Sequence, residues 1–162
     1  MIRPFLVLVS AVFAVRAEAG QISGQGKAID SQIIQIGVTR VMLFGVDSVM
    51  RKQTCELDGK PWQCWSAAVR DLQSLLDQGP VTCDPVGEPD VYGRVLARCL
   101  VNGQSLNEEL VSRGFAIARP SESTDYVAAE EAAKEKKLGL WQGKFRLPSE
   151  FRMGAGVAVE RP

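Results

Sequence analysis

The most informative absence in the sequence is histidine, which occurs nowhere among its 162 residues. Its absence excludes Ser-His-Asp and Cys-His catalysis, metal sites built on histidine, and pH switches based on imidazole. Net charge is absent too, because 19 Lys and Arg balance 19 Asp and Glu. A uniformly basic nucleic-acid-binding protein is therefore disfavoured, although a local basic patch stays open. Any chemistry must come from carboxylates, arginine, lysine, tyrosine or backbone groups.

Long hydrophobic runs are also scarce, and the most apolar one lies at the N-terminus. It covers residues 5–15 and follows Arg3. Eleven residues are too few for a helix to cross a hydrocarbon core of about 30 Å. Small residues follow and leave two cleavage sites open, after Ala17 and after Ala19. The pattern predicts a cleaved signal peptide over residues 1–19, with no later membrane span, and hence a periplasmic or secreted protein.

The sequence contains four cysteines, an even number in a chain expected to be exported. An oxidising compartment makes disulfides the first interpretation. The alternative is a zinc site, which the lack of histidine and of Cys-x-x-Cys spacing disfavours. Among the three pairings that four cysteines allow, proximity along the chain favours Cys55–Cys64 and Cys83–Cys99. Each bond would close a short loop, worth about 3 kcal/mol of stability in the chain-entropy model.

The hydrophobic pattern predicts short strands and three helices. Strands are expected at residues 22–28, 33–36, 39–46, 80–83 and 94–101. Helices are expected at Trp62–Asp77, after the Ser105/Glu108 capping box, and at Asp125–Lys137, with residues 145–162 as an irregular tail. Five strands with an inserted helix suit a small closed barrel of the oligonucleotide/oligosaccharide-binding (OB) type, an α+β fold.

Three motifs follow one another in the second half of the chain. They are Tyr92-Gly-Arg94, Leu106-Asn-Glu-Glu-Leu-Val-Ser-Arg-Gly114 and Gly139-Leu-Trp141. Together with the stretch Ala28–Met50 they resemble the staphylococcal-nuclease-like (thermonuclease) family in order and spacing. The resemblance implies one such domain over residues 20–141, a five-stranded OB barrel with three helices, followed by a C-terminal tail over residues 142–162. The paired cysteines and the segment Phe145–Arg152 resemble the exported bacterial branch.

The resemblance also implies where the family's chemistry would fall. Active members cut phosphodiester bonds of DNA and RNA with the help of Ca²⁺. Asp47 matches a metal-binding aspartate, and Arg94 matches an arginine that holds the phosphate. The other central positions differ: Gln32 stands for a second metal-binding aspartate, Met42 for the other phosphate-binding arginine, and Met50 for the glutamate that activates water.

These replacements predict a strong loss of cleavage. Ca²⁺ prefers six to eight oxygen ligands, several of them charged, so Asp47 supplies a weak metal site or none. A thioether neither takes a proton from water nor donates a hydrogen bond to phosphate. Losing one such group typically costs about 10²–10⁴ in rate, so a drop of about 10⁶-fold is expected. We therefore expect no cofactor, with Ca²⁺ required only if the protein is a nuclease after all.

A rearranged site is the main alternative to this loss. Arg40 shares a strand face with Met42, Arg51 follows Met50, and Glu56 lies in the adjoining loop. The leading hypothesis is an exported, catalytically impaired domain that acts as a binding or structural module. The competing hypotheses are a Ca²⁺-dependent nuclease with a rebuilt site and an accessory protein for envelope polysaccharide, because OB barrels also bind oligosaccharides. Nucleic acid, an envelope protein or a glycan remain open as partners.

Overall fold

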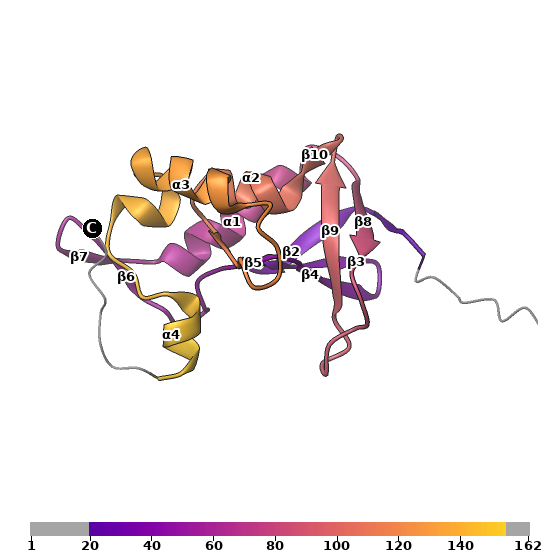
Figure 1. Ribbon diagram of the computed structural model, residues 1–162, viewed down its shortest axis with the longest axis horizontal. Coiled ribbons are helices and arrows are strands. Elements are labelled where there is room, and N and C mark those ends of the chain that lie inside the picture. The colour runs from indigo at the N-terminus through magenta and orange to yellow at the C-terminus, as the bar shows by residue number, and fades with distance from the viewer. Residues whose placement is uncertain (1–19, 155–162) are drawn as a thin grey trace, which may run out of the picture.

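The computed structural model describes residues 20–154, so the predicted signal peptide lies outside the described residues. The strands are β1 (Ile22–Gly24), β2 (Gly26–Asp30), β3 (Ile33–Ile36), β4 (Thr39–Leu43), β5 (Val46–Asp47), β6 (Cys55–Leu57), β7 (Lys60–Trp62), β8 (Val81–Pro85), β9 (Val95–Val101), β10 (Gln104–Ser105) and β11 (Ile117–Ala118). The helices are α1 (Cys64–Leu76), α2 (Leu106–Ser112), α3 (Val127–Glu135), the 3₁₀ helix η1 (Gly139–Gln142) and α4 (Pro148–Arg152). Figure 1 shows α1, α2 and α3 gathered to one side of the long strand β9, with α4 standing apart below them.

The main sheet is mixed and has the order β1-β8-β9-β4-β3-β2, with β10 added to β9. All its neighbouring strands are antiparallel except β4 and β9, which run parallel. Two further ladders are small: β5 pairs with β11, and β6 pairs with β7. This arrangement confirms the predicted α+β fold of the OB type.

The expected closed barrel is wrong, because the ladder of the described sheet does not form a ring. Its two edges, β1 and β2, are separated in sequence by Gln25 alone. The first half of this run pairs with β8 and the second half with β3, so the chain itself joins the two edges. At the β2 edge, the N–H of Ala28 donates to Oε1 of Gln73 from helix α1 (2.9 Å). A helix side chain therefore satisfies a backbone group that a further strand would otherwise pair.

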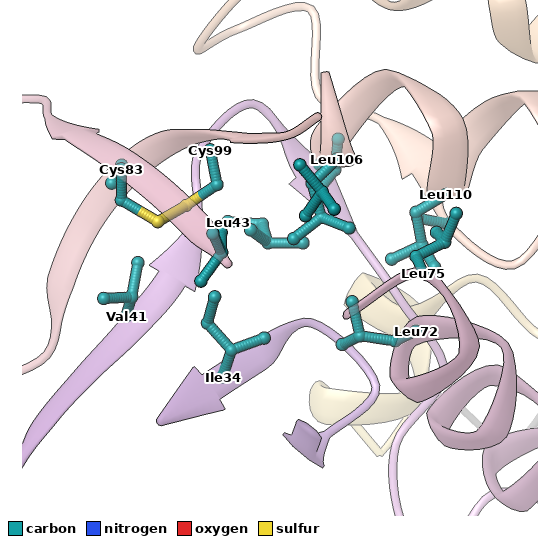
Figure 2. Packing of buried hydrophobic residues seen from close by; sticks show 14 of the residues in the cluster. Ile34, Val41, Leu43, Leu72, Leu75, Cys83, Cys99, Leu106 and Leu110 are labelled. Carbon is teal, nitrogen blue, oxygen red and sulfur yellow. A yellow bond between two sulfur atoms is a disulfide. The ribbon is translucent and has the colours of Figure 1, made fainter. Parts of the chain in front are cut away.

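The core lies between the sheet and the helices, and a disulfide forms part of it. Figure 2 shows the Cys83–Cys99 bond beside Val41 and Leu43. Both cysteines are fully buried, as is Leu72 of helix α1. The second disulfide joins Cys55 to Cys64, and both bonds have the predicted pairing. The two bonds tie β8 to β9 and the β6–β7 hairpin to α1.

The predicted elements are largely present, with two differences that concern the site. The predicted strand 39–46 divides into β4 and β5, separated by a turn in which Gly45 has a φ of 77°. The expectation of three helices and an irregular tail is wrong, because η1 and α4 follow α3. Pro148 begins α4, where a proline costs no helical hydrogen bond, and Glu150 accepts a hydrogen bond from the N–H of Leu147 (3.3 Å).

The disulfides also bear on where the protein resides. Two disulfides and no free cysteine among the described residues indicate an oxidising, extracellular compartment. Among residues 20–154, every helix is too short or too polar to pass through a membrane.

Candidate functional site

Sequence positions that the resemblance connects with catalysis come from separate parts of the fold. Gln32 lies in the turn between β2 and β3, Met42 lies in β4, and Asp47 ends β5. Met42 is in register with Leu96 of β9. Because side chains alternate along a strand, Arg94 belongs to the same face as Leu96, opposite the buried core face. The fold thus places Met42 and Arg94 on one outward face, on neighbouring parallel strands.

Asp47 is buried, and its carboxylate is occupied by an arginine from the C-terminal helix. Only 4% of the Asp47 side chain is exposed. Arg152 donates from Nη1 to Oδ1 (2.9 Å) and from Nη2 to Oδ2 (2.5 Å), while the N–H of Ser48 also donates to Oδ1 (3.0 Å). This is the two-pronged geometry in which a guanidinium matches a carboxylate best. Hydrogen bonding to Asp47 outweighs partial burial and raises the pKa of Arg152, so the arginine stays charged.

Met50 follows Asp47 in a loop that the C-terminal segment covers. Its sulfur lies 3.8 Å from Nη1 of Arg152. Its backbone N–H donates to Oε1 of Gln53 (3.1 Å), and Nε2 of that buried glutamine donates to the carbonyl of Arg146 (2.6 Å). Where active relatives are expected to carry a water-activating glutamate, this chain has a thioether packed beside a guanidinium.

Arg94 is held by its own loop. Its Nε donates to Oδ2 of Asp90 (2.6 Å), and its guanidinium lies over the ring of Tyr92, 5.0 Å from the centroid. Burial of Asp90 opposes ionisation, but hydrogen bonds from the backbone and side chain of Arg94 and from the N–H of Tyr92 lower the pKa of that carboxyl. The arginine expected to grip a phosphate is therefore paired with an ionised carboxylate.

Two positions at the turn between β2 and β3 differ in their contacts: Asp30 has a hydrogen-bond partner, and Gln32 has an amide oxygen without one among the described residues. Asp30 accepts a hydrogen bond from the indole N–H of Trp65 (2.6 Å), and Arg51 lies over the ring of that tryptophan at 4.5 Å. Oε1 of Gln32 is buried and has no hydrogen-bond partner. Gln32 thus presents one unused neutral oxygen where the resemblance implies a carboxylate.

Among the described residues, the contacts of the proposed rescue residues are with groups other than Asp47. Arg40 is exposed and is in register with Gln35 on β3. Arg51 is stacked on Trp65, and Glu56 lies in the β6–β7 hairpin, 4.0 Å from Nζ of Lys144. Within residues 20–154, the charged partner of Asp47 is Arg152, a residue to which the sequence assigned no role.

This donor set does not fit Ca²⁺. Asp47 is the one carboxylate left from the implied ligand set, and both of its oxygens already accept from Arg152. The described residues contain no group of three His, Cys, Asp or Glu side chains that could hold a metal ion. A divalent cation at Asp47 would have to displace a guanidinium, and the other implied ligand position holds the neutral amide of Gln32.

Comparison with known proteins gives the family. The staphylococcal nuclease homologue family matches residues 40–143, most of the chain. The chain belongs to this family. It is also 31% identical over 141 residues to the succinoglycan biosynthesis protein ExoI of Rhizobium meliloti, covering 84% of this chain and 73% of that protein. The family match begins at Arg40, after the segment with Gln32, and ends before α4.

The main functional residue that sequence reasoning missed in this staphylococcal nuclease homologue is Arg152. The local signal for its helix was present: Pro148 at the first helical position and Glu150 two residues later predict a helix start. The pairing itself had no signal, since Arg152 and Asp47 are 105 residues apart in the sequence. The sequence indicated residues 145–152 only by their resemblance to the exported branch and predicted no helix in them.

Proposed function

We propose that this staphylococcal nuclease homologue is an exported protein that no longer cleaves nucleic acid and serves as a binding or structural module in extracellular polysaccharide production. One observation carries the loss of cleavage: both oxygens of Asp47 are engaged by Arg152. The only surviving carboxylate of the implied metal site is thereby neutralised from within the chain. Met50 beside it cannot act as a general base.

Two further features support the same proposal. Met42 gives no hydrogen bond to a phosphate, and Arg94 is already paired with Asp90 at 2.6 Å. A pentavalent phosphate intermediate would therefore meet neither the metal nor the free guanidinium groups that stabilise its charge. The rival proposal, a Ca²⁺-dependent nuclease rebuilt from Arg40, Arg51 and Glu56, lacks a contact that brings these groups to Asp47.

The proposed role in polysaccharide production rests on the similarity to ExoI and on the oxidising compartment that the disulfides indicate. The protein that shares 31% identity over most of this chain is described as a succinoglycan biosynthesis protein. Two disulfides agree with a role outside the cytoplasm. OB-type folds use the same kind of surface for oligosaccharides and oligonucleotides.

A complementation experiment tests this proposal. Deleting the gene should lower the extracellular polysaccharide recovered per cell, and the wild-type gene should restore it. Arg94→Ala should restore it equally well, because a module that does not cleave has no need of the surviving phosphate arginine. Asp90→Asn is the matched control, since it breaks the same ion pair and keeps the arginine.

Two results would count against the proposal, and a third would refine it. Unchanged polysaccharide in the deletion strain would refute the polysaccharide role. Failure of Arg94→Ala alone, at protein levels equal to wild type, would refute the loss of cleavage and favour the nuclease. Failure of both variants would show that the loop holding Arg94 is the working part of the module, without cleavage.

A further inference from the structure

The C-terminal segment, residues 144–152, docks on the loop that follows Asp47, and we call it the C-terminal latch. At its start, Lys144 and Glu56 exchange backbone hydrogen bonds, 2.8 Å in each direction. In its middle, the carbonyl of Arg146 accepts from the buried amide of Gln53 (2.6 Å). At its end, Arg152 reaches Asp47. Three separate contacts thus join one short segment to residues 47–56.

The latch is also organised within itself. The guanidinium of Arg146 lies over the ring of Phe151, 5.4 Å from the centroid, and donates to the carbonyl of Glu150 (3.2 Å). Pro148 is buried. These contacts fix the short helix α4, so Arg152 is presented to Asp47 from a defined backbone position.

The buried carboxylate of Asp47 needs a positively charged partner, either a side chain of the protein or a bound cation. Its side chain is 4% exposed, whereas that of Arg152 is 39% exposed. A buried carboxylate without a counter-charge is costly, and removing one member of a buried pair destabilises a protein strongly. Arg152 supplies a positive charge and two hydrogen bonds, one to each carboxylate oxygen of Asp47.

We propose that Arg152 is an internal counter-ion that has replaced a bound cation at Asp47, and that it latches α4 over the loop in a way that keeps divalent cations out. The inference rests on the proposed loss of cleavage and deepens it, since it explains how the domain keeps its former metal site folded without metal. It concerns stability and access, which are measured separately from activity.

Denaturation of the oxidised full chain tests the latch. Arg152→Gln should raise the unfolding equilibrium constant about 10- to 100-fold, less than for a fully buried pair because the arginine is partly exposed. Amides of residues 151–153 should exchange with solvent about 10-fold faster. Arg152→Lys should lie in between, since it keeps the charge and loses the fork. Arg98→Gln is the matched control, because Arg98 pairs with an exposed Asp125 and should change the constant by about threefold or less.

A double-variant cycle separates the pair from its surroundings. The variant with both Asp47→Asn and Arg152→Gln should have an unfolding equilibrium constant lower than the one expected from multiplying the two single effects. The ratio of the expected to the observed constant, the coupling factor, should be about five or more. About 10 mM Ca²⁺, above the range of weak extracellular sites, should leave the wild-type midpoint unchanged.

The proposal is overturned if Arg152→Gln behaves like Arg98→Gln, or if the cycle shows no coupling. It is also overturned if Ca²⁺ raises the wild-type midpoint and Asp47→Asn abolishes the rise. Cleavage of nucleic acid by a protein that shows full coupling would refute the proposed function and leave the latch intact, so the two failures are distinguishable.

Discussion

Replacing Asn107 by leucine is expected to destabilise the protein by about 3–5 kcal/mol, a large part of the stability of an ordinary domain. Asn107 is fully buried at the start of α2. Its Oδ1 accepts from the N–H of Cys99 (3.0 Å), and its Nδ2 donates to the carbonyls of Phe44 (2.8 Å) and Ala97 (3.2 Å). One side chain therefore joins a helix to strand β9 and to the turn that follows β4.

The cost comes from the backbone groups that leucine would leave without partners. Strand β4 pairs with β9 only as far as Leu43 and Ala97, and β10 pairs with β9 only from Leu100, so Cys99 lies between the two ladders on this side of β9. Asn107 takes the place of the missing strand at Cys99. The carbonyl of Ala97 also accepts from the N–H of Phe44 (2.9 Å), so two buried groups rather than three become unsatisfied. Each costs about 1–3 kcal/mol.

Chemical denaturation with Asn107→Leu and Glu108→Gln measures this effect. Glu108 is the next residue on the same helix and is exposed, so its change should stay within about 0.5 kcal/mol. A loss below about 1 kcal/mol for Asn107→Leu would mean that water or a shifted side chain satisfies Cys99 and Phe44, contrary to the packing described.

The second large effect is expected for Gly114→Ala, which should lower the free energy of unfolding by about 4 kcal/mol or more. Gly114 ends α2 with a φ of 75°, and a Cβ there would lie 2.2 Å from the carbonyl oxygen of Leu138. Gly139 faces it, also with positive φ, and a Cβ on that residue would lie 2.5 Å from the carbonyl oxygen of Gly114. The N–H of Leu140 donates to that same carbonyl (2.8 Å). Two backbones meet here with no room for a side chain, and neither can move as a flexible side chain could.

Gly103→Ala is the matched control for this prediction. Gly103 has nearly the same φ, 78°, but no atom lies within 4 Å of the position a Cβ would take. Its substitution should cost about 1–2 kcal/mol, the conformational penalty alone. The difference between the two variants, measured by thermal or chemical unfolding, isolates the backbone contact. Equal losses would show that the contact at Gly114 relaxes.

The contacts of Asn107 and of the two glycines show what two of the sequence motifs contribute to the fold. The Leu106-to-Gly114 motif contains both Asn107 and Gly114, and the Gly139-Leu-Trp141 motif contains the second glycine of the contact. These two motifs are thus parts of the scaffold and say little about cleavage, whereas Tyr92-Gly-Arg94 contains the position of the phosphate-binding arginine.

The sequence predicted the features that depend on residues close together in the chain, such as the cap of α2 and the disulfide pairing. Ser105 caps α2 by accepting from the N–H of Glu108 (3.2 Å), as the capping box predicted. The two disulfides join cysteines 9 and 16 residues apart, which made the correct pairing the nearest one. Arg94 binds Asp90, four residues earlier, and loop composition alone did not indicate that pair.

The open ladder and the pairing of Asp47 with Arg152 were not predictable, since both depend on groups far apart in the sequence. The edge strand β2 is satisfied by Gln73, 45 residues away from Ala28. Arg152 reaches Asp47 across 105 residues, from a helix too short to show periodicity. The sequence indicated which positions differ from those that the resemblance implies, and the fold showed that Arg152 engages Asp47.

Incubation of the oxidised protein with labelled single-stranded DNA and RNA, with Ca²⁺ or with EDTA, tests most directly whether the cleft has lost its activity. Arg94→Ala serves as the blank, because active relatives are expected to need that arginine. If Arg152 and the two methionines have closed the site, wild type and Arg94→Ala will leave both substrates equally intact in Ca²⁺ and in EDTA. Cleavage that requires Ca²⁺ and disappears in Arg94→Ala would contradict this and would identify a working nuclease.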